Sequence, residues 1–142
     1  MTLNPLTDHA SRRIGAALLF VAATLLGLPT AKAATPQDLL TGYNTQAGTP
    51  ALAARGQAFF TAKHGKEWSC STCHGDVPTQ VGRHASTAKP IGALAPAFNA
   101  ERFTDPTKVE KWFRRNCNDV VGRECGASEK ADVMTWLLTL KP

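Results

Sequence analysis

The sequence lacks the features that would mark a membrane protein, a nucleic-acid binder or a large enzyme. Its longest uncharged apolar run covers 15 residues, 14–28, whereas a membrane-spanning helix needs roughly 18–20. Arg114-Arg115 is the one adjacent basic pair after residue 33, which is a small footprint for nucleic acid. The sequence also has no internal repeat and no convincing strand pattern. With 142 residues, the chain is one domain by default, so a two-domain enzyme, a multi-span membrane protein and a nucleic-acid-binding protein are excluded.

The first 33 residues have the pattern of a secretory signal peptide. Arg12 and Arg13 precede the apolar run, and Ala31-Lys32-Ala33 is a small-x-small cleavage site. We therefore expect a signal peptide over 1–33 and a mature domain over 34–142, exported to an oxidising compartment such as the bacterial periplasm. An uncleaved membrane anchor is the alternative. The mature domain has 109 residues, of which 13 are basic and 10 acidic, so its net charge is +3.

Four helical patterns follow the apolar run. Their expected start signals are a capping residue with or without a following proline: Thr35-Pro36, Thr49-Pro50, Asp105-Pro106 and Ser128. Gly56 is expected to be a small contact point on the second helix. Residues 75–104 carry several prolines and glycines, and so long a loop is unusual in a small domain unless it wraps something. The pattern predicts an all-α fold.

Cys70-Ser-Thr-Cys73-His74 is the most informative motif. Two thiols three positions apart on a tight turn can each add to a vinyl group on one porphyrin edge, and the next histidine can then bind the iron. A zinc site needs a second close ligand pair, whereas the other two cysteines are eight residues apart. A thioredoxin-like dithiol needs a strand–helix–strand context, which is absent. The motif predicts one covalently attached haem c, with helices wrapped around it and His74 as an iron ligand.

The remaining cysteines, Cys117 and Cys125, form an even pair in a chain expected in an oxidising compartment. Such a pair suggests a disulfide. Its short loop would stabilise the fold by roughly 2–3 kcal/mol in the loop-entropy model. The alternative is two free, buried thiols.

The ligand on the second face of the iron decides the function, because a permanent methionine sulfur gives an electron carrier and a labile ligand gives a gas-binding centre. Met134 lies among core positions of the last helical pattern, so we interpret it as packing. His64 lies at the end of the second helical pattern and His84 lies in the long loop. For both histidines, a solvent-exposed side chain is the simpler interpretation.

Asn116 is the remaining candidate ligand. Val109, Trp112 and Phe113 lie at helical spacing and define an apolar face of the third helical pattern. Asn116 continues that face, so its amide is expected to point into the interior. A buried amide needs a partner, and iron is one such partner. The alternative is a helix-terminal asparagine that satisfies backbone groups, and spacing alone does not separate the two.

Several segments resemble one known family. They are Cys70–Gly75, Ile91–Pro96, Arg102–Asp105, Val109–Trp112, Arg115–Asn118 and Gly122–Cys125. Over nearly the whole mature region the chain resembles the sphaeroides haem protein family. The resemblance implies a small class I-type monohaem cytochrome c fold, Asn116 as the sixth iron ligand and a disulfide between Cys117 and Cys125. It also implies oxygen binding by the reduced haem with transient loss of the asparagine, and a dihaem cytochrome c or a membrane b-type cytochrome as the electron donor.

Two functions remain open at this point. The first is a periplasmic electron-transfer cytochrome whose reduced haem binds O2, CO or NO through release of Asn116. Whether it turns over, by reducing oxygen or oxidising nitric oxide, is open, and no catalytic side chain is assigned. The second is a plain electron carrier with permanent six-coordination. In either case Arg114, Arg115 and Arg123 are expected to form a basic rim, which would be solvated or would steer an acidic redox partner.

Overall fold

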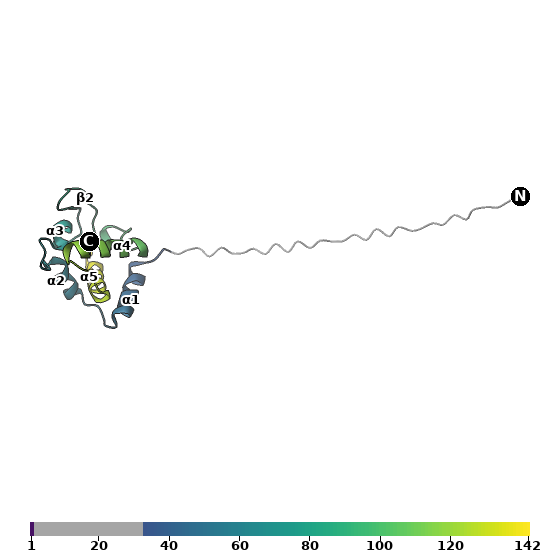
Figure 1. Ribbon diagram of the computed structural model, residues 1–142, viewed down its shortest axis with the longest axis horizontal. Helices are drawn as coiled ribbons and strands as arrows, with labels where there is room; N and C mark the ends of the chain where they lie inside the picture. The colour runs from purple at the N-terminus through teal and green to yellow at the C-terminus, as the bar shows by residue number, and fades with distance from the viewer. Residues whose placement is uncertain (2–32) are drawn as a thin grey trace. The chain divides into compact units, whose positions relative to one another are not determined.

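The structure is a computed structural model that describes Met1 and residues 33–142. The predicted signal peptide and its cleavage site therefore lie almost entirely outside the described residues. The elements, in chain order, are α1 (Pro36–Ala47), α2 (Ala53–Thr61), α3 (Cys70–His74), β1 (Gly82–Arg83), β2 (Pro90–Ile91), the 3-10 helix η1 (Pro96–Phe98), α4 (Pro106–Val120) and α5 (Ala127–Thr139). The helix-rich architecture agrees with the all-α prediction (Figure 1). Within the described residues, no helix has the length and hydropathy to cross a membrane.

Helix α5 is the centre of the hydrophobic core, because both α1 and α2 pack against it. Figure 1 shows α5 between these two helices. The buried apolar side chains of α5 are Ala131, Val133, Met134, Trp136 and Leu137. Phe60 of α2 places its ring 5.0 Å from that of Trp136, and Tyr43 of α1 joins the same cluster. The sequence analysis places Met134 among core positions of the last helical pattern, and this is confirmed.

The crossing of α2 and α5 depends on Gly56. A side-chain carbon built on Gly56 would lie 2.0 Å from the backbone oxygen of Asp132 and 2.7 Å from the backbone nitrogen of Val133. Side-chain carbons do not approach backbone atoms this closely, so only the hydrogen of glycine fits. The small contact point expected at Gly56 is confirmed.

The carboxylate of Asp132 fixes the start of α2. It accepts hydrogen bonds from the backbone N–H of Leu52 at 2.7 Å and from Nε and Nη2 of Arg55 at 2.7 and 2.8 Å. Helix α2 consequently begins at Ala53, and the start predicted at 49–50 was wrong. The capping group comes from α5, 80 residues later in the sequence, and no local pattern can show it.

Acid should destabilise the fold through Asp132. Burial raises the pKa of its carboxyl group, but the hydrogen bonds from Arg55 and Leu52 outweigh burial, so the pKa lies below its ordinary value. Such a group stabilises the folded protein above its unfolded pKa, about 4, and this contribution is lost as pH falls through the folded pKa. We expect Asp132→Asn to lower the free energy of unfolding at pH 7 by about 2 kcal/mol. The difference from the wild type should shrink below about pH 4.

Denaturant titrations from pH 7 to pH 2 measure this difference. Asp119→Asn is the control, because Asp119 is an exposed aspartate of α4. It should change the free energy of unfolding little at any pH. A loss for Asp132→Asn that stayed constant over the whole pH range would contradict the role given to the ionised carboxylate.

The other long helices begin as their capping residues predict, with one exception. Thr35 and Asp105 cap α1 and α4 through their side chains. Helix α5 instead has Gly126 at its N-cap, so Ser128 lies inside the helix. The carboxylate of Glu129 accepts the N–H of Gly126 at 2.8 Å and supplies the cap that Ser128 was predicted to give.

The loop over residues 75–104 contains a short β-hairpin that the sequence did not predict. Strands β1 and β2 are antiparallel and pair Gly82 with Ile91 and Arg83 with Pro90. Two residues on each strand are too few to produce a recognisable alternating pattern. The hairpin lies beside α3 (Figure 1).

Helix α4 is tied to α1 and α5 by one polar cluster. Tyr43 donates its hydroxyl hydrogen to Oε1 of Glu110, and Lys130 Nζ donates to Oε2 of Glu110 at 2.7 Å. The Lys130 nitrogen also lies 5.4 Å from the ring centre of Tyr43 and 5.9 Å from that of Phe113. Burial and the hydrogen bond to Glu110 raise the pKa of Tyr43 well above its ordinary value, so the phenol stays protonated. These contacts fix the position of α4.

Candidate functional site

The motif found in the sequence folds into α3, a single helical turn. The Ser69 hydroxyl accepts the N–H of Thr72 at 3.2 Å, and the Thr72 hydroxyl accepts the N–H of Ser69 at 3.0 Å, which caps the turn. Gly75 ends the turn with a φ of 78°, a left-handed conformation that favours glycine. Positions i and i+3 are neighbours on a helix surface, so Cys70 and Cys73 project from the same side of the turn.

His74 is held in an environment that keeps its imidazole neutral. Burial, with a smaller contribution from the guanidinium of Arg102, lowers the pKa of His74 to about 4. Neutral imidazole is the form that binds a metal ion. The His74 ring lies 6.1 Å from the ring of Phe60, which packs on Trp136. The hydrophobic core thus supports the histidine.

The long loop packs back onto α3. Pro78 is fully buried, and its carbonyl oxygen accepts the N–H groups of Leu94 at 3.0 Å and Ala95 at 3.1 Å. A side-chain carbon on Gly82 would lie 2.2 Å from the carbonyl oxygen of Cys73, so β1 runs directly against the backbone of the motif. The loop that was expected to wrap something therefore packs against the motif.

The surroundings of the motif fit a haem. Phe98 of the loop and Trp112 of α4 expose 37 and 43% of their surfaces. Exposed apolar surface is available for contact with an apolar group. Both cysteines of the motif are free thiols. In the part of the chain that the structure describes, no three His, Cys, Asp or Glu side chains gather as a metal-ion site, so the zinc alternative finds no further ligands there.

Asn116 lies on an exposed face of α4, which corrects the expectation that it points into the interior. Helix α4 turns Val109, Cys117 and Val120 into the core and leaves Trp112 and Asn116 exposed. Of the expected apolar face, Val109 is buried and Phe113 packs against the core, whereas Trp112 and Asn116 are exposed. The Asn116 side chain makes no hydrogen bond to any described residue. Its amide is therefore available to a bound group.

The other candidate ligands have contacts of their own. Met134 is fully buried in the core, which agrees with its interpretation as packing. Nε2 of His64 lies 2.8 Å from the carbonyl oxygen of Phe59, and the two rings are 4.3 Å apart. Nδ1 of His84 accepts the N–H of Thr87 at 3.3 Å within the hairpin. Asn116 is thus the candidate that is both exposed and without a side-chain hydrogen bond among the described residues.

Cys117 and Cys125 form a disulfide with an S–S distance of 1.99 Å. Both residues are buried, and the bond joins the last turn of α4 to the segment before α5. The carbonyl oxygen of Cys117 also accepts the N–H groups of Val121 at 2.7 Å and Gly122 at 3.0 Å. The turn that carries Asn116 is therefore held by a covalent bond and by backbone hydrogen bonds.

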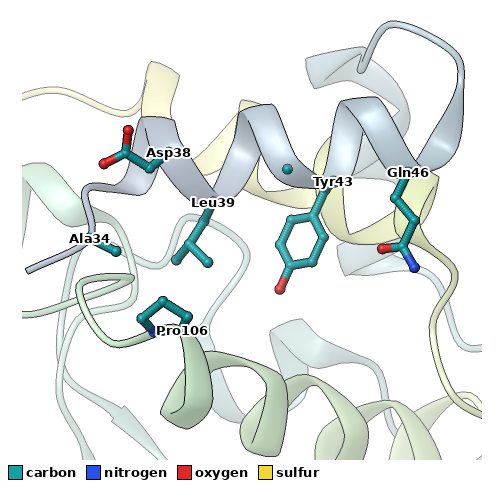
Figure 2. A pocket seen from close by; sticks show the side chains of 7 residues that line it. Ala34, Asp38, Leu39, Tyr43, Gln46 and Pro106 are labelled. Carbon is teal, nitrogen blue, oxygen red and sulfur yellow. The ribbon is translucent and has the colours of Figure 1, made fainter.

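A separate cavity of about 350 Å³ lies between α1 and the start of α4 (Figure 2). It is lined by Ala34, Asp38, Leu39, Gly42, Tyr43, Gln46 and Pro106. Figure 2 shows the Tyr43 hydroxyl pointing across it towards α4. No residue of the motif lines this cavity and Asn116 does not line it either, so it is not part of the candidate haem site.

Comparison with known proteins decides the family. A family model described as a domain of unknown function (DUF1924) matches residues 46–137. The chain is 46% identical over 123 residues to the Cytochrome c-type protein SHP of Cereibacter sphaeroides, which amounts to 84% of this chain and 95% of SHP. The chain belongs to the sphaeroides haem protein family.

Solved structures of related haem proteins agree. The structure of oxidised SHP, an oxygen binding cytochrome c, matches with a TM-score of 0.72 and 46% identity over 76% of this chain and 99% of SHP. Cytochrome c'' of Methylophilus methylotrophus matches in its solution structure, which addressed haem-ligand detachment, with a TM-score of 0.66 and 37% identity over 75% of this chain and 94% of that chain. The predicted helical cytochrome c fold is confirmed. This sphaeroides haem protein carries one haem c, as the motif predicts.

Proposed function

We propose that this sphaeroides haem protein transfers electrons and, when reduced, binds a diatomic gas such as O2, CO or NO after Asn116 is released from the haem iron. One observation carries the proposal. Asn116 is exposed and has no side-chain hydrogen bond to the described residues, yet it lies beside a disulfide that holds its turn in place. Two similarities support it, because SHP is an oxygen binding cytochrome c and work on cytochrome c'' addressed haem-ligand detachment.

The proposal gives each residue of the site one role. Cys70 and Cys73 would hold the haem through thioether bonds, and His74 and Asn116 would bind its iron. When bound, haem supplies an iron that alternates between the ferric and ferrous states. His74 keeps its place because the core supports its ring through Phe60. Asn116 offers a neutral amide oxygen, a hard ligand that suits ferric iron better than the softer ferrous ion.

Release of Asn116 would need a rotation of its own side chain, because the backbone of α4 is held in place. The disulfide of Cys117 holds one end of its helix, and the contacts of Glu110 with Tyr43 and Lys130 hold the middle. The released amide loses no hydrogen bond to a described residue and can be solvated by water. The change is therefore local and reversible.

We also propose that residues 1–33 are a signal peptide and that the domain 34–142 acts in the periplasm, because related c-type cytochromes are generally exported. A dihaem cytochrome c or a membrane b-type cytochrome is the proposed electron donor. The net charge of +3 over residues 34–142 would favour association with an acidic donor.

Optical spectra of Asn116→Ala test the assignment of this ligand. The oxidised variant should be high-spin where the wild type is low-spin, because it lacks the sixth protein ligand. It should bind added cyanide at least about tenfold more tightly, since removal of a competing ligand contact worth about 1.4 kcal/mol changes affinity tenfold. After reduction, the variant and the wild type should take up CO at similar rates, because the variant lacks the amide and in the wild type the amide has left the iron.

Asn118→Ala is the matched control for Asn116→Ala. Asn118 is also an exposed asparagine of α4, and its Nδ2 donates to the carbonyl oxygen of Arg114 at 2.8 Å. This control should keep the wild-type spectra in both oxidation states. If Met134→Leu rather than Asn116→Ala removes the low-spin signature, the ligand assignment is wrong. If reduced wild type stays six-coordinate and excludes CO, the protein is a plain electron carrier.

A further inference from the structure

We infer that the β1–β2 hairpin and the loop at its base form the docking surface for an acidic electron-transfer protein. We call this the hairpin surface and define it by Val77, Val81, Arg83, His84 and Lys89. The inference rests on the proposed electron-transfer function and assigns the partner's position on the molecule. In the step itself, one electron passes from the reduced centre of the partner to the ferric haem, and no covalent bond forms or breaks.

The hairpin lies directly against Cys73 of the haem-attachment motif. The N–H of Ala85, at the start of the hairpin turn, donates to Sγ of Cys73 at 3.3 Å. Gly82 lies so close to the Cys73 carbonyl oxygen that a side-chain carbon there would approach it to 2.2 Å. A thioether sulfur is bonded to the edge of the porphyrin, so the hairpin backbone is one hydrogen bond away from the covalent attachment. A protein docked on the hairpin would therefore have a short route for its electron.

The hairpin also carries positive charge that no ion pair balances among the described residues. Residues 77–100 contain Arg83 and Lys89 but no aspartate or glutamate. Both side chains are exposed, and neither forms an ion pair with another described residue. The basic side chains that do form ion pairs are Arg55, Arg123 and Lys130. Two exposed acidic residues, Asp76 next to Val77 and Glu101, flank this segment, and the hairpin between them carries only positive charge.

The basic rim expected on α4 is a weaker candidate for the same partner. Helix α4 also contains the acidic residues Glu110 and Asp119, and Arg123 is neutralised by Glu129 at 2.6 Å. Arg115 lies over the ring of Trp112, 5.5 Å from its centre. Residues 106–120 carry four basic and two acidic side chains, so their net charge of +2 equals that of the hairpin, whose basic residues are not interleaved with acidic ones.

Exposed apolar side chains give the hairpin surface its third feature. Val77 and Val81 expose 54 and 67% of their surfaces. Val81 directly precedes β1, and Val77 lies on the loop that leads to it. Transient electron-transfer complexes use small interfaces, in which a few apolar contacts lie inside a polar rim. Positive charge beside this apolar area would steer an acidic partner at low ionic strength.

Stopped-flow reduction of the oxidised holoprotein by an acidic plant-type ferredoxin tests the inference. Arg83→Gln/Lys89→Gln should be reduced about five- to tenfold more slowly than the wild type at an ionic strength of about 0.01 M. The difference should disappear near about 1 M. The matched control, Lys111→Gln/Arg114→Gln, removes the same charge from α4 and should stay within about twofold of the wild type. Ferredoxin should also shift the amide NMR signals of residues 82–91 and leave those of α4 unchanged.

Three results would overturn the docking surface. They are equal slowing of both double variants, larger slowing of the α4 variant, and wild-type rates for the hairpin variant at low salt. The same samples separate this inference from the proposed function, because the hairpin variant should keep wild-type CO uptake after reduction. If Asn116→Ala leaves the ferric spectrum unchanged while the hairpin variant is slow, the gas-binding function fails and the docking surface stands. If Asn116→Ala changes the ferric spectrum as expected while the hairpin variant is reduced at the wild-type rate, the docking surface alone fails.

Discussion

Gly56→Ala is expected to lower the free energy of unfolding by about 3 kcal/mol or more, although it adds a single methyl group. The new carbon would lie 2.0 Å from the backbone oxygen and 2.3 Å from the backbone carbon of Asp132. Because these are backbone atoms of a packed helix, no side-chain rotation can relieve the clash. Helices α2 and α5 would have to separate, which would loosen the contact of Phe60 with Trp136 and the bond from the Leu52 N–H to Asp132.

Gly42→Ala is the matched control for this prediction. Gly42 lies within α1, and a side-chain carbon built on it meets no other atom within 4 Å. Alanine is favoured over glycine in a helix, so this variant should raise the free energy of unfolding by about 0.5–1 kcal/mol. Denaturant titration of the two holoproteins measures both effects. If Gly56→Ala unfolds at the wild-type denaturant concentration, the close approach of α2 and α5 is not present in solution.

The sequence predicted those parts of the fold that depend on local patterns. The apolar stripe of the last helix includes Val133, Trp136 and Leu137, which are all buried because regular spacing places them on one face. The motif at Cys70–His74 could be interpreted because its chemistry requires fixed neighbours in the sequence. The unusual length of the loop over residues 75–104 also indicated that it wraps something, and it packs against the motif.

The parts that could not be predicted depend on partners distant in the sequence. The start of α2 is set by Asp132, which is provided by another helix. On α4, Cys117 is buried with its disulfide bond to Cys125, whereas Trp112 is exposed. The spacing pattern depends only on the hydropathy of each side chain. It therefore assigned Trp112 to the core and predicted that Asn116, one turn later, points the same way.

The sequence analysis also missed two residues that shape the site. Gly82 permits β1 to lie against the backbone of Cys73, and a single glycine in a glycine-containing loop gives no signal of that contact. Arg102 donates to the carbonyl oxygens of Ala93 at 2.8 Å and Gly92 at 2.6 Å, and its charge helps to lower the pKa of His74 to about 4. An arginine next to an apolar segment could have indicated a partly buried role, but its acceptors are backbone atoms that the sequence does not identify.

The two pairs of cysteines should behave in opposite ways when they are replaced. Cys70→Ala/Cys73→Ala is expected to lose all covalently attached haem, because the thioether bonds need these two sulfurs. Cys117→Ala/Cys125→Ala is expected to keep its haem covalently attached and to lose about 2–3 kcal/mol of stability with the disulfide. The structure motivates this contrast, since the first pair is free on one side of α3 and the second pair is bonded and buried.

Haem staining after denaturing electrophoresis separates the two outcomes, because a thioether bond survives denaturation and an axial ligand bond does not. This readout does not require the first variant to fold, so a destabilised protein still gives an answer. The second variant controls for the general effect of removing two cysteines, and its unfolding curve reports the contribution of the disulfide. Stained haem in Cys70→Ala/Cys73→Ala, or its loss from Cys117→Ala/Cys125→Ala, would show that the sulfurs that attach haem are not those of α3. The proposed positions of His74 and Asn116 relative to the haem would then be wrong as well.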